Sequence, residues 1–257
     1  MILPGRAQGR RKTDQTARKT RSGTGVPSSG RYGWRYSMSR VAAPLTLALV
    51  LIAATGVATA SAASPDPVLL VHGYRGSPSS WADMKAYLEG QGRKVYAIDL
   101  PGENNIDNAK AIAEKLRELR WSRVDLVGQS MGGLSARWFT RFAAKGTKVD
   151  AYVSLGTPQY GIWSACTLPS WYGGQMCPKS SFLARLNEGD DTPGDASYTT
   201  IYSTGDWYVP NSASRLDGGA CFVQVEDISH NDMDNVSSVQ AATATALDGG
   251  CPGTFRT

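Results

Sequence analysis

The sequence predicts a single α/β domain built on a mainly parallel sheet that helices cover on both faces. Three observations lead to this prediction: strand-like segments alternate with helix-like segments, the first strand is a continuous apolar run, and glycine ends several elements. Repeated strand–helix units place parallel strands side by side, and buried parallel strands are apolar throughout. The 257 residues are enough for one large domain, and length alone does not require two.

The expected elements follow one another from Pro67 onward. The run "VLLVHG" (68–73) is predicted as a buried strand, and "SSWADMKAYLEGQG" (79–92) as a helix that glycine ends. The next helix, 105–121, has apolar residues at helical spacing: Ile106, Ala109, Ile112, Ala113, Leu116 and Leu119. The other predicted strands are 94–102, 124–129, 149–158, 198–204 and 221–226, and the other helices are 131–146, 181–187 and 233–249. An irregular stretch runs from 159 to about 180.

The basic charge of the chain is concentrated at its start. Residues 1–62 hold 10 of the 27 Lys and Arg residues and one of the 22 acidic residues, Asp14. The remainder, 63–257, therefore has 17 basic and 21 acidic residues, a formal charge of −4. A net charge of +5 that belongs to the leader does not indicate a nucleic-acid partner, so we exclude that class.

The leader has the layout of a secretory signal peptide. An apolar run, "VAAPLTLALVLIAATGVATASA", follows Arg40 and ends in the small residues Ala60-Ser61-Ala62. We expect cleavage after Ala62 and secretion of residues 63–257, with 1–62 a disordered basic leader and signal peptide. An uncleaved anchor is the alternative, disfavoured because the run is rich in Ala, Thr and Gly. Translation starting at Met1 or at Met38 is left open.

All four cysteines lie in the part expected to be exported. An even number of cysteines there implies two disulfides. Three connectivities are possible, and we favour Cys166–Cys177, which closes a short loop, and Cys221–Cys251, which holds the C-terminal end. No C-x-x-C motif or His/Cys cluster indicates a metal site. A structural calcium is left open, although no ligand loop is recognisable.

The segment "VDLVGQSMGG" (124–133) carries the motif G-x-S-x-G around Ser130. The motif alone is weak, because a chain rich in glycine and serine contains it by chance at an appreciable rate. Its context strengthens it: a predicted strand leads into Ser130, a predicted helix follows, and glycines flank the serine where a sharp turn admits only small residues. We predict Ser130 as a nucleophile, with a structural turn serine as the alternative.

A serine nucleophile needs an adjacent base, and the chain has only two histidines. His72 lies at the end of the first predicted strand, a position that shapes the oxyanion loop in hydrolases with such a serine turn, so we expect it to be structural. His230 follows the last predicted strand, and the chain order Ser…Asp…His selects it as the base. The acid that orients it should end the penultimate strand, where "STGDWYVP" places Asp206. Weaker candidates for the acid are Asp99, Asp217, Asp227 and Asp232.

Two backbone amides are expected to stabilise the oxyanion of a tetrahedral intermediate. The N–H of Met131 directly follows the predicted nucleophile. The second is the N–H of Tyr74 in the loop after the first strand. Because the amide is the donor, the identity of either side chain matters little.

Several motifs together resemble one family: "HGYRG", "GQSMGG", "LGTP", "STGDWYVP" followed by "SRLDG", and "ISHNDM". They are similar to those of the small secreted bacterial lipases of the α/β-hydrolase fold, closest to lipase class 2, which lacks a large lid domain. The resemblance covers 66–249. It implies a triad of Ser130, Asp206 and His230, an oxyanion hole at Tyr74 and Met131, and ester hydrolysis without a cofactor.

The chain departs from this family in two places. Many relatives have histidine where this chain has Gln129, a position that is not the general base. The segment between "LGTP" and Asp206 is longer than the most compact lipases need, and it can form a stapled flap over the site. We predict that aromatic residues in the surrounding loops line an apolar pocket, with packing under the loops as the alternative. The residues in question are Tyr74, Tyr160, Trp163 and Trp207.

The sequence as a whole predicts a secreted, monomeric serine ester hydrolase that acts through an acyl-enzyme. Its expected substrates are triacylglycerols or shorter acyl esters, met at an oil–water interface, with no membrane anchor after cleavage and no metal or organic cofactor. A polyester hydrolase or an acyltransferase with the same site is the alternative. A non-catalytic binding protein on this fold is the remote alternative.

Overall fold

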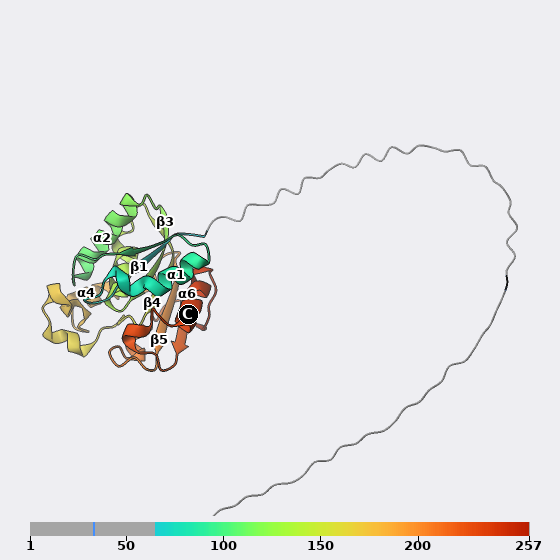
Figure 1. The fold of residues 1–257 in the computed structure, drawn as a ribbon. Helices are drawn as coiled ribbons and strands as arrows, with labels where there is room; N and C mark the ends of the chain where they lie inside the picture. The colour runs from blue at the N-terminus through green and yellow to red at the C-terminus, as the bar shows by residue number, and fades with distance from the viewer. Residues whose placement is uncertain (1–32, 34–64, 257) are drawn as a thin grey trace, which may run out of the picture. The chain divides into compact units, whose positions relative to one another are not determined.

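The computed structural model describes residue 33 and residues 65–256 (Figure 1). The predicted signal peptide, its cleavage after Ala62, the alternative start at Met38 and the boundary between 1–62 and 63–257 all lie outside the described residues. Among the residues that are described, no helix combines the length and the apolar character needed to cross a bilayer.

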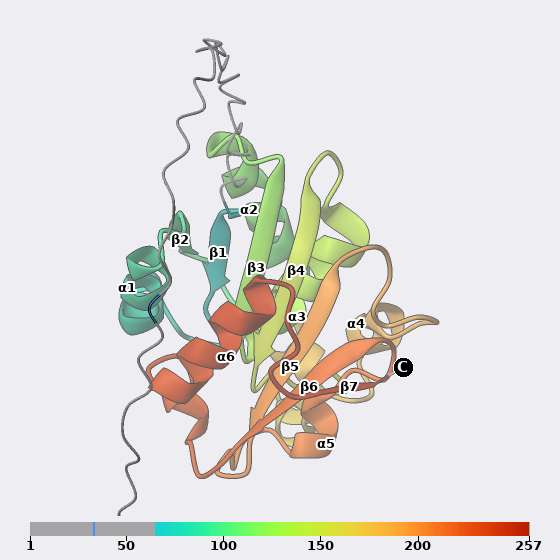
Figure 2. The same ribbon diagram turned by 90° about the vertical axis from the view of Figure 1, so that its right-hand side faces the viewer.

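The centre of the fold is a sheet that has seven strands in the described residues, in the order β2-β1-β3-β4-β5-β6-β7 (Figure 2). The first six strands are parallel, and β7 runs antiparallel to β6. The strands are β1 Val68–Val71, β2 Val95–Ile98, β3 Arg123–Gln129, β4 Lys148–Leu155, β5 Ser197–Ser203, β6 Ala220–Val225 and β7 Thr254–Arg256. The mainly parallel α/β fold predicted from the sequence is therefore confirmed.

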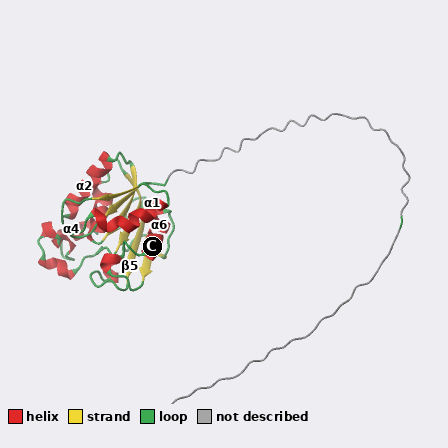
Figure 3. Ribbon diagram, viewed as in Figure 1, coloured by secondary structure: helices red, strands yellow, loops and turns green. Residues whose placement is uncertain are grey.

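Helices cover both faces of the sheet (Figure 3). In Figure 2, α6 crosses in front of the strands while α2 and α3 lie behind them. The α-helices are α1 Ala82–Gly90, α2 Asn105–Glu118, α3 Met131–Trp138, α4 Ser181–Leu186, α5 Asn211–Ser214 and α6 Ser237–Leu247. A π-helical turn, Phe139–Ala143, continues α3. Short 3-10 turns occupy Pro78–Trp81, Trp163–Thr167, Ser170–Tyr172, Gly174–Met176 and His230–Asp232.

The apolar runs of the strands feed two cores. Side chains alternate between the faces of a strand, so Val68 and Leu70 of β1 pack with Met84 of α1 and Val239 of α6. Their neighbours on the other face, Leu69 and Val71 among them, pack with α2 and α3. Both faces must be apolar, which explains why the strand reads as an uninterrupted hydrophobic run.

A third, smaller core lies under the irregular segment that follows β4. Residues of this segment and of α4 pack against the start of α3. The buried members are Met131, Leu134, Ala165, Met176, Phe182, Leu183 and Leu186. The segment is also closed by the Cys166–Cys177 disulfide, and Cys221 of β6 is joined to Cys251. Both pairings favoured from the sequence are the ones present in the structure.

The structure differs from the predicted elements mainly near the C-terminal end. Helix α6 begins at Ser237 rather than at 233, because 230–236 form a 3-10 turn and a loop. Strand β7 and the short helix α5 were not predicted. All three residues of β7 are exposed, so no apolar period marks it, and it pairs with β6 next to the disulfide at Cys221.

Candidate active site

Ser130 stands at the turn between β3 and α3 with a backbone that is unusual for serine. Its φ of 54° and ψ of −127° lie outside the regions that residues with a Cβ normally adopt. The amide of Ser130 donates to the carbonyl of Leu155 at the end of β4, 2.9 Å away, which holds the turn in place. Such strain persists only where the surroundings enforce it, and it is common at functional sites.

The glycines around Ser130 are required by close backbone contacts. A Cβ on Gly128 would lie 2.5 Å from the Cα of Gly133, so the strand could not turn back against the helix. A Cβ on Gly132 would lie 2.2 Å from the carbonyl oxygen of Val71, where α3 approaches β1. The sequence motif therefore corresponds to a tight strand-to-helix turn that presents the serine at the carboxyl end of the sheet.

His230 connects Ser130 to Asp206 by two hydrogen bonds. Its Nε2 lies 2.9 Å from the Oγ of Ser130, and its Nδ1 lies 2.7 Å from the Oδ2 of Asp206. The side chains of His230 and Asp206 are 9% and 1% exposed. With a proton on Nδ1 donated to the carboxylate, Nε2 is left to accept the proton of the serine hydroxyl. The three residues selected from the sequence lie together in the structure.

Asp206 is held by the turn that follows β5. Its Oδ1 accepts hydrogen bonds from the amides of Tyr208 and Val209, each 2.9 Å away, which leaves Oδ2 for His230. Gly156 lies against this pair with φ at +54°, and a Cβ there would come within 2.9 Å of the Oδ2 of Asp206. The carboxylate is therefore oriented by backbone donors and by a neighbour without a side chain.

Ser203 links the turn of Asp206 to the loop of His230, a role that sequence reasoning missed. This fully buried hydroxyl at the end of β5 accepts from the amides of Gly205, 3.1 Å away, and Ile228, 2.9 Å away. A Cβ on Gly205 would lie 2.8 Å from the backbone of Asp227, so the two loops touch. No pattern in the sequence marks Ser203, because its partner Ile228 is 25 residues away.

Gln129, the departure from the family pattern, also contacts the loop of the proposed base. Its Nε2 donates to the backbone carbonyl of His230, 3.0 Å away. The residue before Ser130 therefore ties the end of β3 to the histidine loop. A side-chain amide makes this bond without adding an ionisable group beside the proposed nucleophile.

His72 has both ring nitrogens engaged elsewhere. Its Nε2 accepts from the amide of Leu100, 3.2 Å away, and its Nδ1 lies 3.0 Å from the carbonyl of Gly73. The ring is buried and joins the loop after β1 to the end of β2. It therefore has no nitrogen available for Ser130, and the structural role expected from the sequence agrees with these contacts.

The two amides expected at an oxyanion hole come from the loop after β1, which carries Tyr74, and from the start of α3 at Met131. Met131 is the first residue of α3, where amides have no partner within the helix. Across 65–256, no hydrogen bond engages the amide of Tyr74 or Met131. A Cβ on Gly73 would lie 2.8 Å from the Cβ of Ser130, so the loop that carries Tyr74 packs directly on the serine.

An open cavity of about 630 Å³ surrounds Ser130 and His230. Tyr74 lines it as predicted, whereas Tyr160 and Trp163 line a neighbouring cavity of about 460 Å³. Trp207 lines neither cavity and is 95% exposed, because the chain turns Asp206 inward and the next residue outward. The remaining residues of the first cavity are Arg75, Gln129, Ile162, Met176, Tyr208, Val209 and Asn231. Ile162 and Met176 were missed because no periodic pattern marks their irregular segment.

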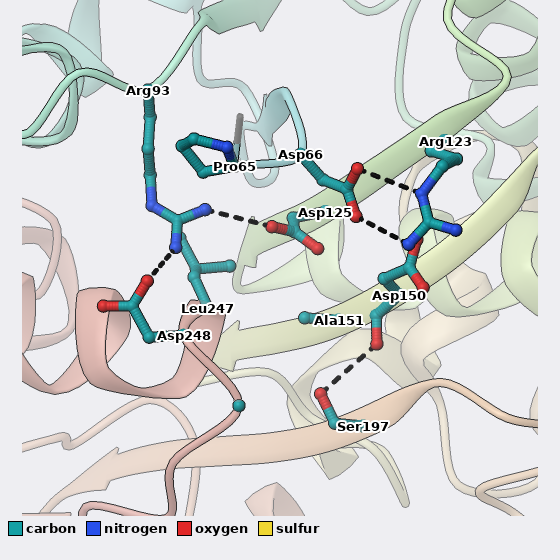
Figure 4. A pocket seen from close by; sticks show the side chains of 11 residues that line it. Pro65, Asp66, Arg93, Arg123, Asp125, Asp150, Ala151, Ser197, Leu247 and Asp248 are labelled. Carbon is teal, nitrogen blue, oxygen red and sulfur yellow. Dashed lines mark hydrogen bonds and ion pairs between the residues drawn. The ribbon is translucent and has the colours of Figure 1, made fainter. Parts of the chain in front are cut away.

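A second cavity of about 630 Å³ lies at the opposite, amino end of the strands (Figure 4). Arg93 bridges the carboxylates of Asp125, 3.2 Å away, and Asp248, 2.5 Å away. Arg123 bridges Asp66 and Asp150 at 3.1 and 2.9 Å. Burial, which removes hydration from the carboxylate, raises the pKa of Asp125 to about 7. The charge of Arg93 lowers this pKa and offsets the effect of burial only in part. The charged residues that line this cavity form ion pairs, and its lining contains no serine–histidine pair, so it is not the candidate active site.

The sheet order, the strained serine after β3, the acid after β5 and the histidine after β6 define an α/β-hydrolase fold. The chain belongs to the alpha/beta hydrolase family, whose model matches residues 68–240.

Two curated relatives are similar to part of the chain. A triacylglycerol lipase of Burkholderia plantarii is 28% identical over 142 residues, which are 50% of this chain and 39% of the relative. A triacylglycerol lipase of Pseudarthrobacter phenanthrenivorans is 30% identical over 114 residues, 39% of this chain and 35% of the relative. The chain thus matches well under half the length of either relative.

Solved structures share the fold. The Bacillus licheniformis lipase BlEst2 in its mature form superimposes with a TM-score of 0.61 at 20% identity, covering 72% of this chain and 93% of that chain. At this level of identity, the similarity shows a shared fold and is not evidence for a shared reaction.

Proposed function

We propose that the protein is a secreted, monomeric serine ester hydrolase of the lipase/esterase type. The observation that carries the proposal is the chain of hydrogen bonds from Ser130 through His230 to Asp206, at 2.9 and 2.7 Å. A serine on a strained strand-to-helix turn with a base within hydrogen-bond distance is the arrangement that acyl transfer requires. The two curated relatives are both named as triacylglycerol lipases, which supports lipid esters as the substrate class.

In the proposed reaction, the Oγ of Ser130 attacks the ester carbonyl carbon while the Nε2 of His230 accepts the hydroxyl proton. The C–O bond to the alcohol then breaks, and His230 returns this proton to the leaving oxygen. Water, deprotonated by the same nitrogen, then attacks the acyl carbon. The C–O bond to the Oγ of Ser130 breaks, His230 returns the proton to this oxygen, and the acid leaves. Asp206 holds the imidazole in the tautomer with a proton on Nδ1 and stabilises its charged form.

The amides of Tyr74 and Met131 are proposed to donate to the oxyanion in both tetrahedral intermediates. Preorganised donors of this kind lower the barrier more than donors in water would, because they need not reorient as charge develops. The amino end of α3 adds a favourable dipole at the same place.

Export remains part of the proposal, with a signal peptide in 1–62, cleavage after Ala62 and a catalytic domain in 63–257. Two disulfides support it, because disulfides persist in oxidising compartments. No metal or organic cofactor is needed for the steps above.

Replacing the proposed nucleophile tests the function. Ser130→Ala should lower kcat/KM for p-nitrophenyl butyrate by roughly 10³-fold or more, because no other group supplies the attacking oxygen. The same variant should lose labelling by a fluorophosphonate probe. Ser122→Ala, an exposed serine at the amino end of β3, is the matched control and should keep both. Retention of activity by a folded Ser130→Ala protein would exclude the proposal.

A polyester hydrolase with the same site is favoured by one further observation. Trp163 lines the cavity beside the cleft and Tyr208 lines both cavities, and each is 66% exposed, so a solid polymer has flat apolar groups to contact. Release of monomers from a polyester film at a rate comparable to soluble ester hydrolysis would identify this activity. Release at the rate of the Ser130→Ala variant would exclude it.

A further inference from the structure

The cleft at Ser130 continues into the neighbouring cavity that Tyr160 and Trp163 line. The first cavity and the cavity of about 460 Å³ share two lining residues, Ile162 and Tyr208, so they meet there. We call this cavity of about 460 Å³ the side trough. Its lining carries no charged side chain and consists of Tyr160, Gly161, Ile162, Trp163, Ser164, Pro178, Tyr208, Pro210, Ser212 and Ala213.

A hydrogen bond joins the two walls of the side trough. One wall follows β4 and the other follows β5, and the amide of Tyr160 donates across them to the carbonyl of Ala213, 3.2 Å away. The hydroxyl of Tyr160 is engaged with the Oδ2 of Asp191 at 2.5 Å, so the polar end of this residue is already satisfied. A preformed trough with a mainly apolar lining favours an apolar chain, because little ordering is needed on binding.

The position of Tyr208 relates the side trough to the proposed base. Its ring centroid lies 5.5 Å from that of His230, and its amide donates to the Oδ1 of Asp206. Through Tyr208 the trough therefore borders the part of the cleft where His230 lies, while Ile162 borders it from the core that contains Met131. The expected oxyanion donors, Tyr74 and Met131, come from different elements, the loop after β1 and the start of α3.

This arrangement assigns the parts of a bound ester. The carbonyl oxygen must face the amides of Tyr74 and Met131, and the leaving oxygen must lie within reach of the Nε2 of His230 to receive its proton. A chain attached to the leaving oxygen passes beside His230 and Tyr208, where the side trough begins.

We propose that the side trough binds the apolar chain of the leaving alcohol, so that the preferred substrates are esters of long-chain or lipid alcohols. The inference rests on the proposed function, since it needs an ester at Ser130. Each methylene buried in the trough should raise kcat/KM by up to roughly fourfold, until the trough is filled.

Two series of esters distinguish a trough that binds the alcohol chain from a trough that binds the acyl chain. With the acyl group fixed as butyrate, kcat/KM should rise from ethyl through butyl to octyl butyrate, whereas kcat for esters limited by deacylation stays constant because all form the same butyryl-enzyme. The second series fixes the alcohol as ethanol and lengthens the acid from butanoate to octanoate.

Bulky substitutions from each wall test the side trough directly. Ser212→Trp and Ser164→Trp replace serines that line it and are exposed, so a folded protein is expected from each. Either should lower the ratio of kcat/KM for octyl over ethyl butyrate at least tenfold. Ser122→Trp, the same change at the amino end of β3, should keep the wild-type ratio.

The outcomes are distinct. If both trough variants instead lower the octanoate-to-butanoate ratio of the ethyl esters, the trough holds the acyl chain and the inference is overturned. If neither ratio changes in folded variants, the trough takes no part of the ester, which also overturns it. If the wild-type protein hydrolyses no ester and Ser130 resists the fluorophosphonate probe, the proposed function has failed.

Discussion

At the scale of single residues, the two oxygens of Asp206 have different partners. Backbone amides of Tyr208 and Val209 occupy Oδ1, and only Oδ2 faces His230. The turn therefore fixes the orientation of the carboxylate before any substrate arrives. Gln129 adds a contact to the backbone of His230, so the histidine is held through both its ring and its main chain.

The arrangement at Asp206 makes the effect of Asp206→Asn predictable. The amide oxygen of the new side chain should remain at the two backbone donors, which turns its NH₂ group toward the Nδ1 of His230. That nitrogen must then accept, so the proton moves to Nε2, and the imidazole no longer takes the proton of Ser130. We expect kcat for p-nitrophenyl butyrate to fall roughly 10³- to 10⁴-fold with little change in KM.

The matched control for this variant is Asp227→Asn. Asp227 is exposed and has φ at +52°, a conformation that asparagine tolerates, so activity should stay near the wild-type level. A larger loss in Asp227→Asn than in Asp206→Asn would contradict the assignment of the acid.

At the scale of elements, the irregular segment after β4 does more than connect two strands. The amide of Ile162 donates to the carbonyl of Met176, 2.9 Å away, and both residues line the cleft. The Cys166–Cys177 disulfide closes the loop between them. The flap considered from the sequence is thus a stapled wall of the cleft with a small core of its own.

The two disulfides should affect stability and binding differently. Removing Cys166–Cys177 opens a link across 11 residues, and removing Cys221–Cys251 opens one across 30. Chain entropy predicts losses in the free energy of unfolding of about 3 and about 4 kcal/mol. KM for p-nitrophenyl butyrate should rise more in Cys166→Ala/Cys177→Ala, because only this pair closes the wall of the cleft.

Urea unfolding and steady-state kinetics on the two double alanine variants test this prediction. Each variant serves as the control for the other, since both lose one disulfide. A larger KM change in Cys221→Ala/Cys251→Ala would argue against a role of the segment after β4 in shaping the cleft.

At the scale of the whole molecule, the two ends of the sheet have different chemistry. The carboxyl end carries the proposed catalytic residues, and the amino end carries the buried ion pair of Arg93 with Asp125, which the exposed Asp248 extends. Burial raises the pKa of Asp125 to about 7 and that of Asp234 to about 6. Both carboxyl groups therefore bind protons more tightly in the folded state than in the unfolded chain.

The raised pKa of Asp125 sets the sign of a pH effect on stability. From about pH 4 to 7 the folded state holds more protons than the unfolded state, so this group lowers the free energy of unfolding as the pH rises through that window. Asp125→Asn removes the dependence. The free energy of unfolding of the variant, relative to the wild type, should therefore increase from pH 4.5 to pH 8.

Urea titrations at pH 4.5, 6 and 8 measure this difference. Asp107→Asn, on the exposed face of α2, is the control. Its free energy of unfolding relative to the wild type should not increase from pH 4.5 to pH 8. A constant difference between Asp125→Asn and the wild type over this range would contradict the expected protonation of Asp125.

Much of the fold could be predicted because its signals are local. Buried parallel strands need apolar residues on both faces, and helices need them at every third or fourth position, so most elements up to β6 were predicted within a few residues. Strand β7 could not be predicted, because its pairing depends on β6 and on the Cys221–Cys251 disulfide rather than on an apolar period.

The sequence by itself determined the order of the elements and the strand-to-helix context of Ser130, because both depend on short-range patterns. Its scarcity of histidine also left His230 as the predicted base. Only the tertiary structure decided that Gln129 reaches a carbonyl 101 residues away, that Ser203 joins two loops and that Ile162 and Tyr208 each line two adjoining cavities. These contacts depend on which loops the order of the strands brings together, and no local sequence pattern encodes contacts between residues so far apart in the chain.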